Sequence, residues 1–223
     1  MTEPAEDIRA RSWESIQATI DACRLCEQAN APFLRVPTGR KRHPPFSPPT
    51  PTRILFVSVA PPWGGDYFWA EGRPDAVREG LFQALNGIGN SIRTCQDFWS
   101  ARYFLVPGVK CPSESGGNDH LPSSKARDMC ANHLRSEIFT VAPERILALG
   151  REAMASISSA LGLNAPRTVS AIRRSGPWWA TVGGQIIPVA GTYFPGNNRH
   201  NGLAFIGPDI QALLQSAHTR SSG

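Results

Sequence analysis

Four of the five cysteines are spaced in a way that suits a metal or iron–sulfur site. Cys23 and Cys26 form a C-x2-C pair at the end of a predicted helix, Cys111 follows an apolar run, and Cys130 falls inside a later predicted helix. A single C-x2-C pair is compatible with zinc, redox chemistry or chance, and isolated cysteines are commonly ordinary buried residues. Four thiolates together suit either an iron–sulfur cluster or a zinc site, with Cys95 left over. Spacing alone does not separate iron from zinc.

The composition is that of a folded protein from a reducing compartment. The chain has 223 residues, of which 41% are apolar and 18% charged, enough for one domain over 1–223 with a proper core. No apolar run is long enough to span a membrane, and the polar, acidic N-terminus does not resemble a signal peptide. We therefore expect a cytoplasmic monomer, in which clustered cysteines indicate metal binding or catalysis rather than disulfides.

Basic residues are in moderate excess. Lys and Arg number 23 against 18 Asp and Glu, a net charge of +5, which favours a polyanionic partner such as DNA. Part of this charge, Arg40-Lys41-Arg42-His43, lies in a proline-rich loop at 32–52. Because proline disfavours regular elements, we expect this loop to be extended over the surface, either contacting phosphate or simply solvated.

Apolar runs alternate with amphipathic segments along the chain. The predicted strands are 53–59, 103–106, 145–150 and 186–189, and the predicted helices are 6–23, 75–85, 123–139, 151–161 and 208–217. Strands that are apolar throughout are typical of parallel sheets covered on both faces. The pattern predicts an α/β fold, a three-layer α/β/α sandwich with a mostly parallel central sheet. Its ligand site is expected where 60–69, 107–120 and 192–201 follow the carboxyl ends of strands.

Six short motifs occur in an informative order. They are Cys23-x2-Cys26, the run Leu55–Val59 ending in Ala60-Pro61-Pro62, Val109-Lys110-Cys111, Cys130, Leu149-Gly150-Arg151-Glu152-Ala153 and Thr192-Tyr193-Phe194-Pro195. Over nearly its whole length the chain thereby resembles the iron–sulfur uracil-DNA glycosylases, families 4 and 5 of the uracil-DNA glycosylase superfamily. The resemblance implies a uracil-DNA glycosylase-like fold and a structural [4Fe–4S] cluster on Cys23, Cys26, Cys111 and Cys130, and it favours iron over zinc.

Three positions depart from the resemblance. Val59 stands where family 4 has its active-site Glu, and Pro107 stands where an Asn reads the edge of uracil. Phe194 stands where the Thr-Tyr-His-Pro motif of the family has its His. Family 5 also has an apolar residue at the first position, so Val59 alone does not exclude activity. Proline has no side-chain donor or acceptor, so uracil readout of the family kind is not expected. The scaffold therefore implies a DNA glycosylase for another base.

The loop after the first strand holds candidates for chemistry on a base. A glycosylase extrudes its base into a pocket and stabilises a positively charged sugar and a departing base anion. Asp66 is the candidate catalytic acid or base, and Phe68, with Tyr67 beside it, is the candidate stacking partner of the base. The alternatives are a turn residue for the aspartate and plain core for the aromatics. The other expected base-binding residues are Ala60, Pro61, Pro107 and Phe194.

A second group of polar residues follows Pro195, in the segment 196–202, which we call the late loop. Asn197 and His200 are expected to support catalysis at the sugar or the leaving base, and Asn198 and Arg199 are expected to contact DNA. A Gly- and Asn-rich stretch is also a common turn. The segment Asn118-Asp119-His120 is a weaker candidate for the same cleft.

Three functions remain open from the sequence. The leading hypothesis is a monofunctional DNA glycosylase that excises a non-uracil base, such as a hypermodified phage pyrimidine like glucosylated hydroxymethylcytosine, in anti-phage defence. The second is a base-excision repair enzyme for uracil or another deaminated base. The third is a catalytically silent nucleic-acid-binding module.

Overall fold

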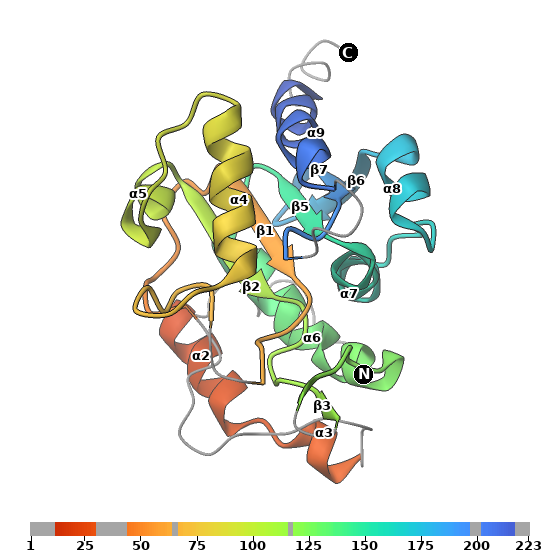
Figure 1. The fold of residues 1–223 in the computed structure, drawn as a ribbon. Helices are drawn as coiled ribbons and strands as arrows, with labels where there is room; N and C mark the ends of the chain where they lie inside the picture. Colours follow the sequence, from red (N-terminus) through yellow and green to blue (C-terminus); the bar gives the residue numbers. More distant parts are fainter. Residues whose placement is uncertain (1–11, 30–43, 64–66, 116–117, 197–201, 217–223) are drawn as a thin grey trace.

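A computed structural model describes residues 12–29, 44–63, 67–115, 118–196 and 202–216 (Figure 1). Its centre is a five-stranded sheet in the order β2-β1-β5-β7-β6. The strands are β1 (Ile54–Ser58), β2 (Tyr103–Pro107), β5 (Ile146–Leu149), β6 (Trp178–Val182) and β7 (Gln185–Thr192). The first four in this order are parallel, and β6 runs antiparallel to β7. The expected α/β architecture with a mostly parallel sheet is confirmed.

Helices cover both faces of the sheet. On one face α4 (Ala76–Gly87) packs with α9 (Leu203–Ser216), and on the other α6 (Ser124–Val141) packs with α7 (Arg151–Leu161) (Figure 1). The remaining elements are α2 (Trp13–Ala22) against α6, α3 (Leu25–Gln28), α5 (Cys95–Ser100) beside β2, α8 (Val169–Ser175) beside β7, and a small pair of strands, β3 (Glu114–Ser115) and β4 (Asn118–Asp119). None of the described helices is long and apolar enough to cross a membrane.

The burial of the strands explains why apolar runs in the sequence predicted them. Every residue of β1, β2 and β5 is buried, as expected for strands sandwiched between two helical layers. The predicted start of α6 is also confirmed, because the side chain of Ser123 accepts a hydrogen bond from the N–H of Ala126 at 3.2 Å. Of the proline-rich loop only the part from residue 44 is described, so its basic run lies outside the described residues.

Two details differ from the predicted elements. A further short helix, α8, precedes the β6–β7 hairpin, and its last turn contains Arg173 and Arg174. The side chain of Thr168 caps that helix. In addition, the last helix, predicted over 208–217, begins at Leu203, so Pro208 lies inside it and not at its start.

Gly80 allows α4 to approach the chain that leaves β7. A Cβ atom at this position would lie 2.7 Å from the carbonyl oxygen of Pro195 and 2.9 Å from the side chain of Leu203. These two residues lie on either side of the late loop. The close approach at Gly80 therefore positions Pro195 and Leu203, the residues that flank the late loop.

We predict that Gly80→Ala lowers the free energy of unfolding by about 1–3 kcal/mol, because the new methyl group would overlap the carbonyl oxygen of Pro195 and crowd the side chain of Leu203. Gly87→Ala is the matched control at the end of the same helix, where an added Cβ meets nothing within 4 Å. It should be neutral or stabilising by up to about 1 kcal/mol, since alanine favours helix over glycine. Urea unfolding of both variants measures this, and equal stability of the two would contradict the packing argument.

Candidate functional site

Cys23, Cys26, Cys111 and Cys130 line one partly enclosed cavity. Three separate segments supply them: the end of α2 with α3, the chain after β2, and α6. Cys23 is partly exposed and the other three are buried, and none forms a disulfide. Cys95 lies elsewhere, buried at the start of α5.

Two of these thiols interact directly. A hydrogen bond with Cys130, reinforced by burial, raises the pKa of the Cys26 thiol. The same bond, with help from the backbone N–H of Lys110, lowers the pKa of Cys130 to about 7. Cys130 is thus readily converted to the thiolate, the form that binds metals. By contrast, burial raises the pKa of Cys95 to about 12, which keeps it a protonated thiol.

The four thiols form a donor set that suits either an iron–sulfur cluster or a zinc ion. Among the described residues, no group of three or more His, Cys, Asp or Glu side chains is close enough to hold a metal ion in this structure. The choice of iron over zinc therefore comes from the motif resemblance alone.

A buried ion pair joins the three segments that contain the cysteines. The ammonium group of Lys110, the neighbour of Cys111, donates hydrogen bonds to the Glu137 carboxylate on α6 and to the carbonyl of Pro107. Gln17 on α2 donates to the other oxygen of Glu137 at 3.4 Å. The Lys110 and Glu137 side chains are 2% and 0% exposed. The pair therefore links α2, the end of β2 and α6 at one point.

The cysteine cavity lies beside the carboxyl edge of the sheet. The N–H of Gly108 donates to the carbonyl of Ser58 at 2.8 Å, which continues the β1–β2 pairing past the end of β2. The next residue, Val109, belongs to a small buried group with Cys130, and Ala60 packs against that group. The chain that follows β1 is therefore in contact with the surroundings of the cysteines.

Four expected base-binding residues lie at this same edge. The chain leaves β1 for β2 on one side and later adds β5 on the other, so the sheet has its topological switch point between β1 and β5, where ligands of such sheets bind. Ala60 and Pro61 follow β1, and Pro107 ends β2. Phe194 packs over Gly150 at the end of β5, where a Cβ would lie 3.2 Å from the Phe194 Cβ. Gly150 has φ +93°, a conformation that favours glycine.

Phe68 is a core residue in this conformation. Its side chain is 2% exposed, and its ring lies 5.0–5.8 Å, centroid to centroid, from the rings of Trp69, Phe82 and Phe98. Stacking on an extruded base would require that ring to be uncovered. The base-stacking role of Phe68 therefore stays a prediction, and its packing matches the alternative of plain core.

The hydroxyl group of Tyr67 is buried and has no hydrogen-bond partner among the described residues. Burial, with the nearby Glu137 charge, raises the pKa of Tyr67 well above its ordinary value, so the hydroxyl keeps its proton. Buried polar atoms without partners are uncommon in folded proteins and often mark a place for a ligand or water. Tyr67 is thus the expected base-binding residue with an unused donor.

The expected catalytic residues Asp66, Asn197 and His200, and the expected DNA contacts Asn198 and Arg199, lie outside the described residues. The structure describes the residues that flank them, namely Trp63 and Tyr67 on either side of 64–66, and Gly196 and Gly202 on either side of 197–201.

The carboxylate of Asp119 lies close to the chain that follows β1. The backbone N–H of Trp63 donates to the carboxylate of Asp119 in β4, which places Asp119 beside the loop that follows β1. The weaker of the sequence-based candidates for this cleft is therefore in contact with the loop that contains Asp66.

A charged group that the sequence analysis missed joins the elements on either side of 197–201. Arg173 on α8 donates to both carboxylate oxygens of Asp209 on α9, at 2.7 and 2.9 Å, and the hydroxyl of Thr192 donates to Asp209 at 2.5 Å. The Arg173 guanidinium also lies 4.3 Å from the ring centroid of Phe205 and 5.3 Å from that of Tyr193. These contacts join β7, α8 and α9 on both sides of 197–201. Each residue alone reads as an ordinary helix or strand residue, so no sequence signal indicates the group.

No protein-family model matches the chain, and no curated protein is significantly similar to it. The resemblance to iron–sulfur uracil-DNA glycosylases thus rests on short motifs.

We predict that Glu137→Leu lowers the free energy of unfolding by about 3–5 kcal/mol, because it leaves the Lys110 ammonium buried without its counter-charge. The double variant Lys110→Met/Glu137→Leu should recover much of that loss, since it buries no charge. A double-mutant cycle by urea unfolding measures the coupling. Additive losses in the double variant would show that the two side chains do not act as a pair.

Proposed function

We propose that the chain is an iron–sulfur DNA glycosylase that hydrolyses the N-glycosidic bond of a base other than uracil. The proposal rests mainly on one observation: four cysteines from three segments line one cavity next to Ala60, at the edge of the sheet where sites of this fold lie. The family resemblance assigns a [4Fe–4S] cluster to the same four cysteines. We propose DNA with a modified base as the partner, and a monomer as the working form.

The cluster would be held by Cys23, Cys26, Cys111 and Cys130. When bound, it would supply a structural cross-link between the three segments, without a redox step in base removal. All four thiols would have to be deprotonated to bind the cluster, so its binding would release protons. The buried ion pair of Lys110 and Glu137 would hold the same segments in place around it.

The proposed base pocket differs from a uracil site in its polarity. Pro107 is buried at the end of β2, and its side chain offers no donor or acceptor. Ala60, Pro61 and Phe194 add apolar surface at the same edge. Such apolar walls offer no side-chain readout of the polar edge of uracil, whereas the unused hydroxyl of Tyr67 would supply one hydrogen bond to a base. This favours a base other than uracil, and we propose a modified phage pyrimidine that is excised in defence.

The chemistry is assigned to the two loops that flank this edge. Asp66 would orient the attacking water and offset the positive charge that develops on the sugar. Asn197 and His200 would stabilise the departing base, and Arg199 and Asn198 would contact the DNA backbone. Asp119, hydrogen-bonded to the backbone of Trp63, would help to fix the loop that contains Asp66.

We predict that the purified protein contains iron and shows a broad visible absorbance band, and that Cys130→Ser loses most of both. Cys95→Ser is the matched control: Cys95 is equally buried and donates to the carbonyl of Phe68 at 3.3 Å, a bond that serine can keep. Metal analysis and absorbance provide the readout. Zinc in place of iron, or equal iron in both variants, would refute the cluster assignment.

We predict abasic-site formation on oligonucleotides that contain hydroxymethylated or glucosyl-hydroxymethylated cytosine, and little on those that contain uracil, hypoxanthine or xanthine. Asp66→Ala should lower the rate about 10²–10⁴-fold without unfolding the protein, because a general acid–base group contributes about that much. Alkaline cleavage of the product strand measures the rate. Efficient excision of uracil would establish the repair function instead, and salt-dependent DNA binding without excision of any base would establish the silent module.

A further inference from the structure

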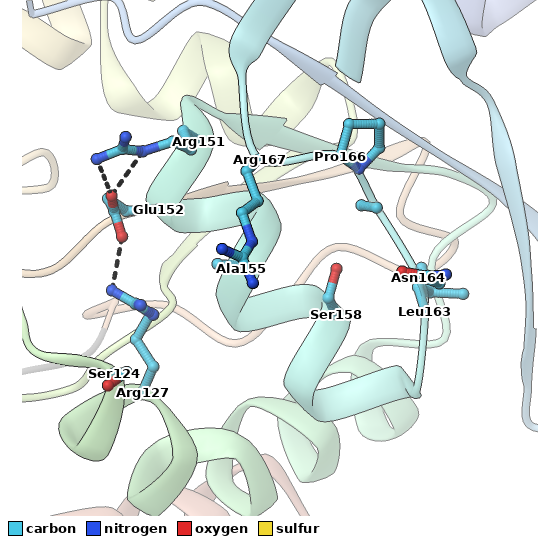
Figure 2. A pocket seen from close by; sticks show the side chains of 11 residues that line it. Ser124, Arg127, Arg151, Glu152, Ala155, Ser158, Leu163, Asn164, Pro166 and Arg167 are labelled. Carbon is cyan, nitrogen blue, oxygen red and sulfur yellow. Dashed lines mark hydrogen bonds and ion pairs between the residues drawn. The ribbon is translucent and has the colours of Figure 1, made fainter. Parts of the chain in front are cut away.

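A second hollow, of about 550 Å³, lies between α6, α7 and the segment 163–167 (Figure 2). Its charged lining residues are Arg127, Arg151, Arg167 and Glu152. Three arginines and one glutamate give this lining a formal charge of +2. The hydroxyls of Ser124 and Ser158 and the amide of Asn164 are the polar neutral groups, and Ala155, Leu163, Ala165 and Pro166 form its apolar wall.

Two of the arginines are held in place by the glutamate. Arg127 donates to one oxygen of Glu152 at 2.6 Å and to the carbonyl of Pro122 at 3.0 Å. Arg151 reaches the other oxygen of Glu152 at 2.8 Å from its Nε and 2.6 Å from an Nη atom. The carboxylate is 13% exposed, whereas Arg151 is 56% exposed. Glu152 therefore orders both guanidinium groups while neutralising only one of the two charges.

The opposite side of the hollow has donors without partners. Arg167 is exposed and projects from 163–167 into the space between the Arg127–Glu152–Arg151 chain and Ser158, as Figure 2 shows. It has no hydrogen bond or ion pair with the described part of the chain. The Ser158 hydroxyl oxygen is buried and likewise has no partner among the described residues. Ordered cations on one side and unused donors on the other leave room for an anion between them.

We propose that this hollow binds the phosphate group of a nucleotide unit, with Arg127 and Arg167 on the phosphate and the sugar or base against Leu163 and Pro166. Guanidinium forks match phosphate oxygens in geometry, and serine hydroxyls add further donors. The volume is larger than a bare phosphate needs, and the apolar wall suits the rest of a nucleotide. A DNA strand and a free nucleotide share this chemistry.

The position of the hollow favours a DNA strand as the source of the phosphate. Arg151 is the first residue of α7 and directly follows Gly150, which lies under Phe194 at the proposed base pocket. A strand whose extruded nucleotide occupies that pocket would continue past Arg151 into the hollow. The inference rests on the proposed function only in naming DNA; the phosphate chemistry stands on the lining residues alone.

The test compares Arg167→Ala with Arg93→Ala in the full-length protein. Arg93 is also exposed, but it lies just before α5, which leads into the amino end of β2, at the far edge of the sheet. Binding of a fluorescein-labelled DNA duplex, and of its single strand, is followed by anisotropy over a range of salt concentrations. Losing one phosphate contact should reduce the slope of log K against log salt by about 0.9 and weaken binding about eightfold at about 0.1 M salt. Arg93→Ala should match the wild type.

A second arm titrates thymidine monophosphate into the wild type and the same two variants by calorimetry. Binding that Arg167→Ala alone abolishes, with DNA binding unaffected, would assign the hollow to free nucleotides. An Arg167→Ala variant that matches Arg93→Ala in both arms, with its unfolding unchanged, would overturn the proposal. Because excision is not measured here, a hollow that binds DNA in a protein that excises no base would leave this inference standing while the glycosylase proposal fails.

Discussion

The ion pair between Lys110 and Glu137 removes two full charges from water, and the free-energy cost of doing so is offset only while the partners stay together. Its members, with Gln17, come from the same three segments that supply the cysteines. Any movement that separates these segments would strand a charge in the core. The ion pair therefore fixes the relative positions of the segments around the cysteine cavity, and it does so without a bound metal group.

This constraint extends to the proposed base pocket. The Lys110 ammonium also donates to the carbonyl of Pro107, and the next hydrogen bond along the chain, from Gly108 to Ser58, ties β2 to the end of β1. At positions 58, 107 and 108 these contacts use backbone atoms only, so they do not depend on which side chain occupies position 107. A scaffold held in this way can keep its geometry while the residues that read a base change. Such a scaffold is compatible with the buried Pro107, whose side chain has no donor or acceptor.

The sequence predicted the features that depend on local pattern. Strands buried on both faces are apolar throughout, Ser123 begins its helix by capping it, and the cysteines stand in a recognisable order of motifs. It did not predict features formed by residues far apart in the chain. Glu137 looks like one more polar residue of α6, and its partner Lys110 lies 27 residues before it. The arginines of the second hollow come from two helices and a connecting segment, so no periodicity marks them.

Gly150 shows how one backbone conformation relates the two proposed sites. Its positive φ turns the chain sharply from the end of β5 into α7, and the absence of a side chain lets Phe194 lie directly over it. The same turn places Arg151 and Glu152 at the start of α7, where they contribute to the charged side of the hollow. Adjacent residues therefore contribute to the proposed base pocket and to the cationic wall of the hollow. A nucleic-acid strand is a ligand that needs both kinds of surface within one nucleotide step, an apolar one for the base and a cationic one for the phosphate.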